Sequence, residues 1–150
     1  MFTPDQEMAA SEMARVVKSG GKIGLANWTP EGFIGQVFKT IGRYLPPPAG
    51  ARSPALWGTR NRIHELFGIH AASITTAQRH FVFRYRSPAH WVEVFRAYYG
   101  PLLTAFAALE PASRVALETD LLTLIDQLNR ARDGSMVVPG EYLEVVITRD

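Results

Sequence analysis

The side chains best suited to bind a substrate follow an apolar segment near the start of the chain. The segment Ile-Gly-Leu-Ala-Asn-Trp at 23–28 reads as a buried strand, and Asn27, Trp28, Thr29 and Glu31 lie at its end. Ligands of α/β folds bind outside the carboxyl ends of strands, so these four side chains could contact a substrate or the edge of a cofactor. The structural alternative is a capped turn with Trp28 packed against a helix.

Aromatic residues elsewhere in the chain could line an apolar pocket for a substrate. The candidates are Phe33, Trp57 and Tyr98, together with Phe38. For each of them singly, ordinary core packing is the more common explanation, because aromatic side chains at helical spacing usually face the interior. We expect Phe33, Trp57 and Tyr98 to contribute to substrate binding alongside the residues at the end of the strand.

No pattern in the sequence identifies a catalytic residue or a metal site. The chain has no cysteine, which excludes a thiolate nucleophile, a disulfide and a cysteine-ligated metal. His64-Glu65 is not followed by a histidine at the metalloprotease spacing, and His90 with Glu93 is not by itself a zinc site. The serines lack the context of a nucleophile elbow. We therefore expect no metal and leave the catalytic residue unknown.

Composition and charge exclude several classes of partner. The formal net charge is +2, with sixteen basic and fourteen acidic residues, which is too mild for a nucleic-acid-binding protein. Arg79, Arg84 and Arg86 are read as solvated charges along one strand. No apolar run is long enough to span a membrane, and the first residues do not resemble a signal peptide. We expect a cytoplasmic protein that binds neither nucleic acid nor membrane.

Helices and three strands must position these residues. With 150 residues, 47% of them hydrophobic, the chain is the size of a single domain spanning 1–150. Apolar spacing, caps and Gly or Pro breaks predict the order of elements. Helices are expected over 3–18, 32–44, 60–67, 87–99, 102–109 and 111–132, and strands over 22–27, 72–85 and 141–148. This order is typical of the α/β class.

The segment Glu12–Trp28, EMARVVKSGGKIGLANW, resembles a motif in the second half of class I S-adenosylmethionine-dependent methyltransferases. In that family a helix ending L-R-V-L-K-P-G-G leads into the fifth strand. The resemblance is closest to the type 11, or ubiquinone/menaquinone biosynthesis-like, methyltransferases, and ANWTPEGFIG is similar to a small-molecule subgroup. Residues 74–85 and 141–149 look like strands six and seven, the last one inserted antiparallel between its neighbours.

The fold implied by this resemblance is a partial Rossmann-like methyltransferase fold. It has a small mixed sheet of about three strands, a parallel pair plus an antiparallel last strand. A helical insert at about 87–134 separates the last two strands. The function implied is methyl transfer to a small molecule, whose identity and attacked atom (carbon, oxygen or nitrogen) the sequence does not give.

The chain departs from the family because the cofactor half is absent. Family members begin with a strand, a G-x-G-x-G loop and then an acidic residue that holds the ribose. No such loop occurs here, and Gly20-Gly21 precede a strand rather than follow one. Met1 aligns with the end of the family's fourth strand. The resemblance thus implies a truncated, carboxyl-terminal half, and although full-length members use S-adenosylmethionine, we expect this chain alone to bind no cofactor.

Loss of that half has a consequence for assembly. In the complete sheet the fifth strand lies between strands four and seven, so here strand 22–27 becomes an apolar edge. The unpaired backbone groups of such an edge can pair with a strand of another chain, and helix faces left uncovered add an apolar patch. We expect a homodimer formed through strand 22–27 or through the apolar face left by the missing half.

Two functions remain open from the sequence. The first is a methyltransferase-like carboxyl-terminal domain that supplies acceptor-pocket elements to a reaction it cannot complete alone. The second is a non-catalytic module, derived from a methyltransferase, that dimerises or binds a small apolar molecule. Binding of S-adenosylmethionine would distinguish the two.

Overall fold

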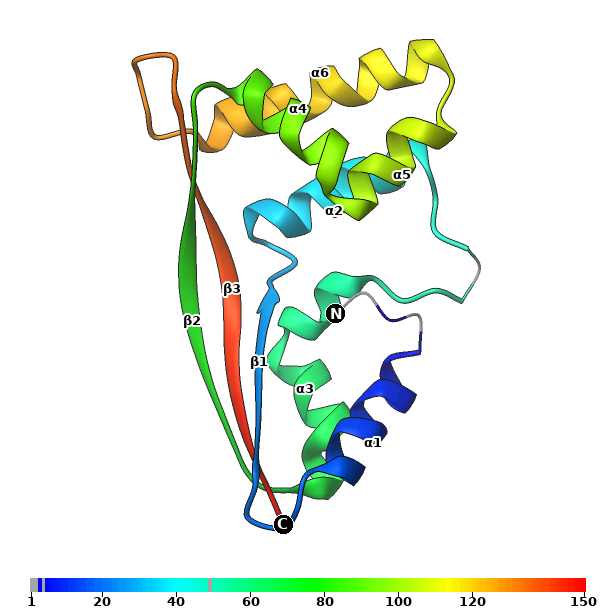
Figure 1. Cartoon of the computed structure of the whole chain (residues 1–150), viewed down its shortest axis with the longest axis vertical. Coiled ribbons are helices and arrows are strands. Elements are labelled where there is room, and N and C mark those ends of the chain that lie inside the picture. Colours follow the sequence, from blue (N-terminus) through cyan, green and yellow to red (C-terminus); the bar gives the residue numbers. More distant parts are fainter. Residues whose placement is uncertain (1–2, 4, 49) are drawn as a thin grey trace. The chain divides into compact units, whose positions relative to one another are not determined.

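The computed structural model describes residue 3, residues 5–48 and residues 50–150. In this described part the chain forms six α-helices and one three-stranded sheet (Figure 1). Its residues group into two compact units. Unit 1 comprises the described residues up to Gly32, Gly50–His80 and Glu141–Asp150, and unit 2 comprises the described residues of 33–48 and Phe81–Gly140. The expectation of a single domain stays a prediction.

The sheet contains β1 (Lys22–Trp28), β2 (Ala71–Tyr85) and β3 (Met136–Arg149) in the order β1-β3-β2. The expected three strands are therefore confirmed, and the last strand in the chain lies between the other two. β1 pairs with β3 in antiparallel register. The sheet is antiparallel, whereas the sequence predicted a parallel pair. No parallel hydrogen-bonded pair joins the strands of the described residues, because β3 separates β1 from β2.

The core of unit 1 lies between the sheet and α1 (Gln6–Val16), α3 (Arg60–Phe67) and the 3₁₀ helix η1 (Pro54–Gly58) (Figure 1). Alternate residues of β1 and β3 point toward these helices, because side chains alternate between the two faces of a strand. A second 3₁₀ turn, η2 (Gly68–His70), follows α3. The buried cluster consists of Ala10, Ile23, Trp57, Ile63, Leu66, Phe67, Leu143, Val145 and Ile147.

The helices of unit 1 begin where side chains cap them. The helix expected over 3–18 begins at Gln6, because Asp5 caps it and accepts a hydrogen bond of 2.8 Å from the Met8 amide. Pro4, which falls within the expected helix, lies outside the described residues. Helix α3 begins as expected after Thr59, whose hydroxyl accepts from the Arg62 amide. A side-chain acceptor at this position satisfies an amide that has no partner within the helix.

Unit 2 is built from α2 (Phe33–Tyr44), α4 (Pro88–Tyr98), α5 (Gly100–Ala108) and α6 (Pro111–Leu128). Helix α2 contacts α5 and α6, and α4 contacts the same two helices. The last three of these helices lie between β2 and β3 in the chain, as expected for a helical insert. The core formed by all four helices of unit 2 includes Phe33, Val37, Trp91, Leu102, Leu117, Leu121 and Ile125.

Two boundaries in unit 2 differ from the sequence prediction. Helix α5 starts at Gly100 rather than at residue 102 as expected, because the proline at 101 is tolerated in the first turn of a helix. Helix α6 ends at Leu128 rather than at Arg132. The Asn129 side chain explains this end, since it accepts from the Val137 amide and donates to the Ser135 carbonyl, which turns the chain toward β3.

Candidate functional site

The inner face of the sheet in unit 1 changes from apolar to polar at the carboxyl end of β1. The β1–β3 register places Ile23 opposite Ile147, Leu25 opposite Val145, and Asn27 opposite Leu143. The Thr29 amide then donates to the Glu141 carbonyl at 3.2 Å, which continues the ladder by one more pair. Thr29 and Glu141 therefore extend the face that the helices cover, where a polar pair is unusual.

Three side chains form a polar row across this end of the sheet: Thr29 after β1, Glu141 on β3 and His80 on β2. The Thr29 hydroxyl donates to Glu141 Oε1 at 2.8 Å. The other carboxylate oxygen, Oε2, lies 3.8 Å from His80 Nε2, within ion-pair range but longer than a hydrogen bond. Thr29 is 2% exposed, and the side chains of Glu141 and His80 are 25% and 55% exposed. The row thus runs from the interior to the surface.

The turn after β1 is held in place by the same residues. Thr29 Oγ1 also accepts from the Gly32 amide at 3.1 Å. A Cβ on Gly32 would lie 2.9 Å from both the Glu141 carbonyl oxygen and Thr29 Oγ1, so only glycine fits there. The Thr29 hydroxyl consequently fixes the turn and orients one oxygen of the Glu141 carboxylate.

Two buried donors lie behind this turn without a hydrogen-bond partner among the described residues. They are Nδ2 of Asn27, which is 5% exposed, and Nε1 of Trp57, which is 2% exposed. Trp57 belongs to η1, which packs against β1. At Gly58 the two backbones come so close that a Cβ would overlap the Trp28 carbonyl. An unpaired buried donor costs free energy, so these two groups lower the stability of the fold at this end of β1.

The structure brings four of the predicted site residues together within unit 1. Asn27, Trp28, Thr29 and Trp57 lie at the end of β1 in unit 1, with Trp28 packed edge-on against Tyr142. The others are Glu31, which is exposed in the turn, and two residues of unit 2, Phe33 and Tyr98.

The two residues of unit 2 differ in burial. Phe33 is 1% exposed, with ring centroids 5.4 Å from Phe83 and 5.0 Å from Trp91, as in a packed core. Tyr98 is 85% exposed. Substrate binding by any of the seven residues stays a prediction.

Sequence reasoning missed Glu141 and His80. His80 was read as an ordinary histidine, and Glu141 only as the start of the last strand. The signal that could have found them is the strand order, because a last strand inserted in the middle of the sheet puts its first residues beside the ends of both neighbours. The predicted insertion of the last strand already implied this neighbourhood.

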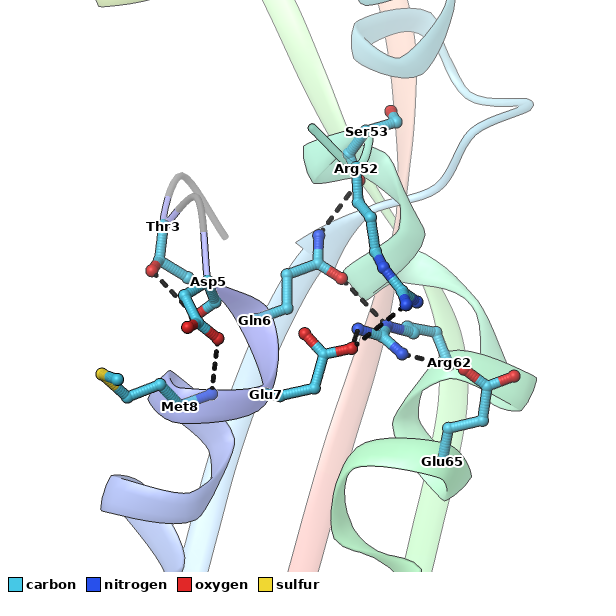
Figure 2. A network of polar contacts seen from close by, with 9 residues as sticks. All are labelled: Thr3, Asp5, Gln6, Glu7, Met8, Arg52, Ser53, Arg62 and Glu65. Atoms are coloured by element: carbon cyan, nitrogen blue, oxygen red, sulfur yellow. Dashed lines mark hydrogen bonds and ion pairs between the residues drawn. The ribbon is translucent and has the colours of Figure 1, made fainter. Parts of the chain in front are cut away.

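A second polar cluster in unit 1 surrounds Arg62, whose side chain is 7% exposed (Figure 2). Its guanidinium donates to Gln6 at 2.9 Å, to Glu7 at 2.7 Å and to Glu65 at 2.9 Å. Arg62 lowers the pKa of Glu7 through this hydrogen bond. Since each nitrogen of the guanidinium donates to a side chain, this cluster fastens α1 to α3.

The Gly20-Gly21 turn does not form the glycine-rich loop that would hold S-adenosylmethionine, the cofactor implied by the resemblance. The chain's glycine pair lies before β1, where the Gly20 amide donates to the Arg149 carbonyl and the Gly21 amide to the Lys18 carbonyl. The Cβ position of Gly21 is filled by Val17 and by the Lys18 carbonyl. Both amides are used within the chain, so this turn cannot cradle a cofactor as a glycine-rich loop does.

The part of the chain that the structure describes contains no group of three or more His, Asp or Glu side chains placed to hold a metal ion. No helix there is long and apolar enough to cross a membrane. The cytoplasmic location stays a prediction.

Comparison with known proteins finds relatives in mycobacteria. The chain is 36% identical over 145 residues to the uncharacterized protein Rv1403c of Mycobacterium tuberculosis and to Mb1438c of Mycobacterium bovis. It is 35% identical over 145 residues to a second M. tuberculosis protein, Rv1405c. Each alignment covers 95% of this chain and 52% of the relative, so the chain spans about half the length of the curated relatives it matches. No protein-family model matches the chain.

Proposed function

We propose that residues 1–150 form the carboxyl-terminal half of a Rossmann-like, class I methyltransferase fold that acts on a small molecule. The observation that carries this proposal is the strand order β1-β3-β2, with β3 antiparallel to β1. The resemblance to that family implies a last strand inserted antiparallel between the two before it. This arrangement is uncommon for a meander, in which sequential strands lie side by side.

Two further observations support the proposal. Since the sheet is antiparallel and β3 is central, β1 and β2 run in the same direction, as strands five and six do in that family. The relatives are also about twice as long as the aligned segment, which leaves room in them for a cofactor half. In this reading the end of β1 contributes the acceptor side of the site, and S-adenosylmethionine is bound by residues outside this chain.

The test compares cofactor binding by this chain and by Rv1403c in calorimetric titrations with S-adenosylmethionine. We expect Rv1403c to bind the cofactor and residues 1–150 to show no heat of binding. Absence of binding to Rv1403c would contradict the methyltransferase assignment. Tight binding by residues 1–150 would contradict the division of the fold into a cofactor half and an acceptor half.

The alternative, a dimerising or ligand-binding module without catalysis, is favoured by one observation on β1. The backbones of Thr29 and Gly21 hydrogen-bond to β3. In an antiparallel pair, successive residues direct their N–H and C=O groups alternately toward the partner strand and away from it. The backbone groups of Lys22, Gly24 and Ala26 therefore point away from β3. All three are exposed, and no strand of the described residues pairs there. We call Lys22, Gly24 and Ala26 the free edge and propose that it can pair with a second copy of the chain.

A further inference from the structure

Glu141 is a partly buried carboxylate of unit 1 whose nearest basic group is a histidine. Its side chain is 25% exposed, and its partners are the Thr29 hydroxyl and the His80 imidazole. No arginine or lysine of the described residues lies within ion-pair distance of it. A partly buried carboxylate loses hydration, and the Thr29 hydroxyl, with an imidazole 3.8 Å away, returns only part of that free energy. A cation placed beside Glu141 would therefore be stabilised.

The other acidic residues near the sheet differ from Glu141 in this respect. Glu144, on the same strand, pairs with Arg79 at 3.4 Å. Side chains alternate along a strand, so Glu144 and Arg79 lie on the opposite face from Glu141 and His80. Glu7 and Glu65 both pair with Arg62. Among these carboxylates, only Glu141 has a histidine as its nearest basic group.

We propose that the polar row of Thr29, Glu141 and His80 binds the ammonium group of a small amine. This inference rests on the proposed function and narrows it, because it makes the acceptor atom a nitrogen. The ammonium donates a charge-assisted hydrogen bond to the Glu141 carboxylate. Thr29 keeps Glu141 Oε1 in place, so the carboxylate does not have to be ordered when the amine binds.

His80 gives the site a proton acceptor. A protonated amine has no lone pair, so its nitrogen must lose a proton before it can react. Transfer to His80 breaks the N–H bond of the amine, leaves the electron pair on the amine nitrogen and forms an N–H bond on the imidazole. The positive charge moves from the ammonium to the imidazole, and both groups lie beside Glu141. The Glu141 carboxylate therefore stabilises the charge before and after the transfer.

The experiment titrates residues 1–150 with benzylamine and with benzyl alcohol, which have the same ring but differ in charge. Binding is followed by NMR on the Gly32 amide, which donates to Thr29, and on the His80 imidazole. We expect benzylamine to shift both signals in a saturable manner and benzyl alcohol to shift neither. Glu141→Gln should weaken benzylamine binding by about tenfold or more. Glu144→Gln removes the same charge from the other face of β3 and should have no effect.

Equal binding of benzylamine and benzyl alcohol, or unchanged benzylamine binding by a folded Glu141→Gln variant, would overturn the proposal. Thermal melting of each variant distinguishes loss of the site from loss of the fold. None of these measurements uses S-adenosylmethionine. Failure of the amine site is therefore separate from failure of the methyltransferase assignment, which the titration of Rv1403c decides.

Discussion

Thr29 and Glu141 are separated by 112 residues in the sequence, yet the Thr29 hydroxyl donates a 2.8 Å hydrogen bond to Glu141 Oε1. The same hydroxyl accepts from the Gly32 amide. One side chain thus joins the end of β1 to β3 and shapes the turn that follows. This double use makes Thr29 the residue on which the geometry of the polar row depends.

Thr29→Val should lower the free energy of unfolding by about 2 kcal/mol, because it leaves a carboxylate oxygen and a buried amide without a partner at unchanged volume. Thr29→Ser keeps the hydroxyl and should cost about 1 kcal/mol or less, the contribution of one methyl group. Urea denaturation of the two variants measures the difference. Equal destabilisation by valine and serine would show that the methyl group, and not the hydroxyl, matters.

Gly58→Ala should destabilise the chain by roughly 2 kcal/mol or more, since the new Cβ would overlap the backbone of Trp28 and Thr29 rather than a movable side chain. The matched control is Gly42→Ala in α2, where nothing lies within 4 Å of the added Cβ. That change should stabilise the helix by about 0.5–1 kcal/mol. The sign of the two shifts in Tm, measured by circular dichroism, tests both statements.

The hydrogen bond of Arg62 lowers the pKa of Glu7, which predicts a pH dependence of stability. A carboxyl group whose pKa is lower in the folded state stabilises the fold at pH values above its pKa in the unfolded chain, which is near 4.5. This stabilisation is lost as the pH falls through the lower pKa of the folded state. Glu7→Gln should therefore reduce Tm at pH 7, with a smaller reduction at pH 3.

The control for Glu7 is Glu12→Gln, which removes a carboxylate that pairs with Arg15 on the exposed surface of the same helix. It should change Tm less at pH 7 than Glu7→Gln does, because Glu12 does not contact a buried guanidinium. If the two variants behave alike, the contact with α3 contributes nothing to stability.

Ala26→Lys should convert a dimer into a monomer, because it places a charge on the free edge where two copies would pair. Sedimentation velocity at micromolar concentration compares it with the wild-type chain and with Thr119→Lys, which adds the same charge to an exposed position of α6. We expect the wild type and Thr119→Lys to sediment as dimers. A monomeric wild-type chain would contradict pairing through the free edge.

Much of the secondary structure could be predicted from local signals. The expected strand 22–27 and helix 60–67 match β1 and α3 closely, because Gly20-Gly21, Thr59 and Gly68 mark their ends. The first residues of β3 were missed, since the expected strand begins at residue 141 whereas β3 begins at Met136. η1 was also missed, because its Pro/Gly-rich surroundings indicated irregular chain. These two errors arise where tertiary contacts outweigh local preference.

The candidate site was predicted only in the part that local sequence encodes. Asn27 to Thr29 were found because they follow an apolar strand. Glu141 and His80 acquire their role from the pairing of β3 with both neighbours, which no local pattern of residues specifies. Burial of Phe33 among other rings likewise reflects packing that the aromatic pattern left open.

The register of β3 against β1 also constrains how this chain can change over evolutionary time. A single residue inserted or deleted between Glu141 and Leu143 would rotate Glu141 to the opposite face of the sheet, away from Thr29. Substitutions can alter the chemistry of this region gradually, whereas changes in length remove it in one step. Variation in loop length is thereby restricted to segments outside the central strand, such as the Pro/Gly/Ala-rich stretch before η1.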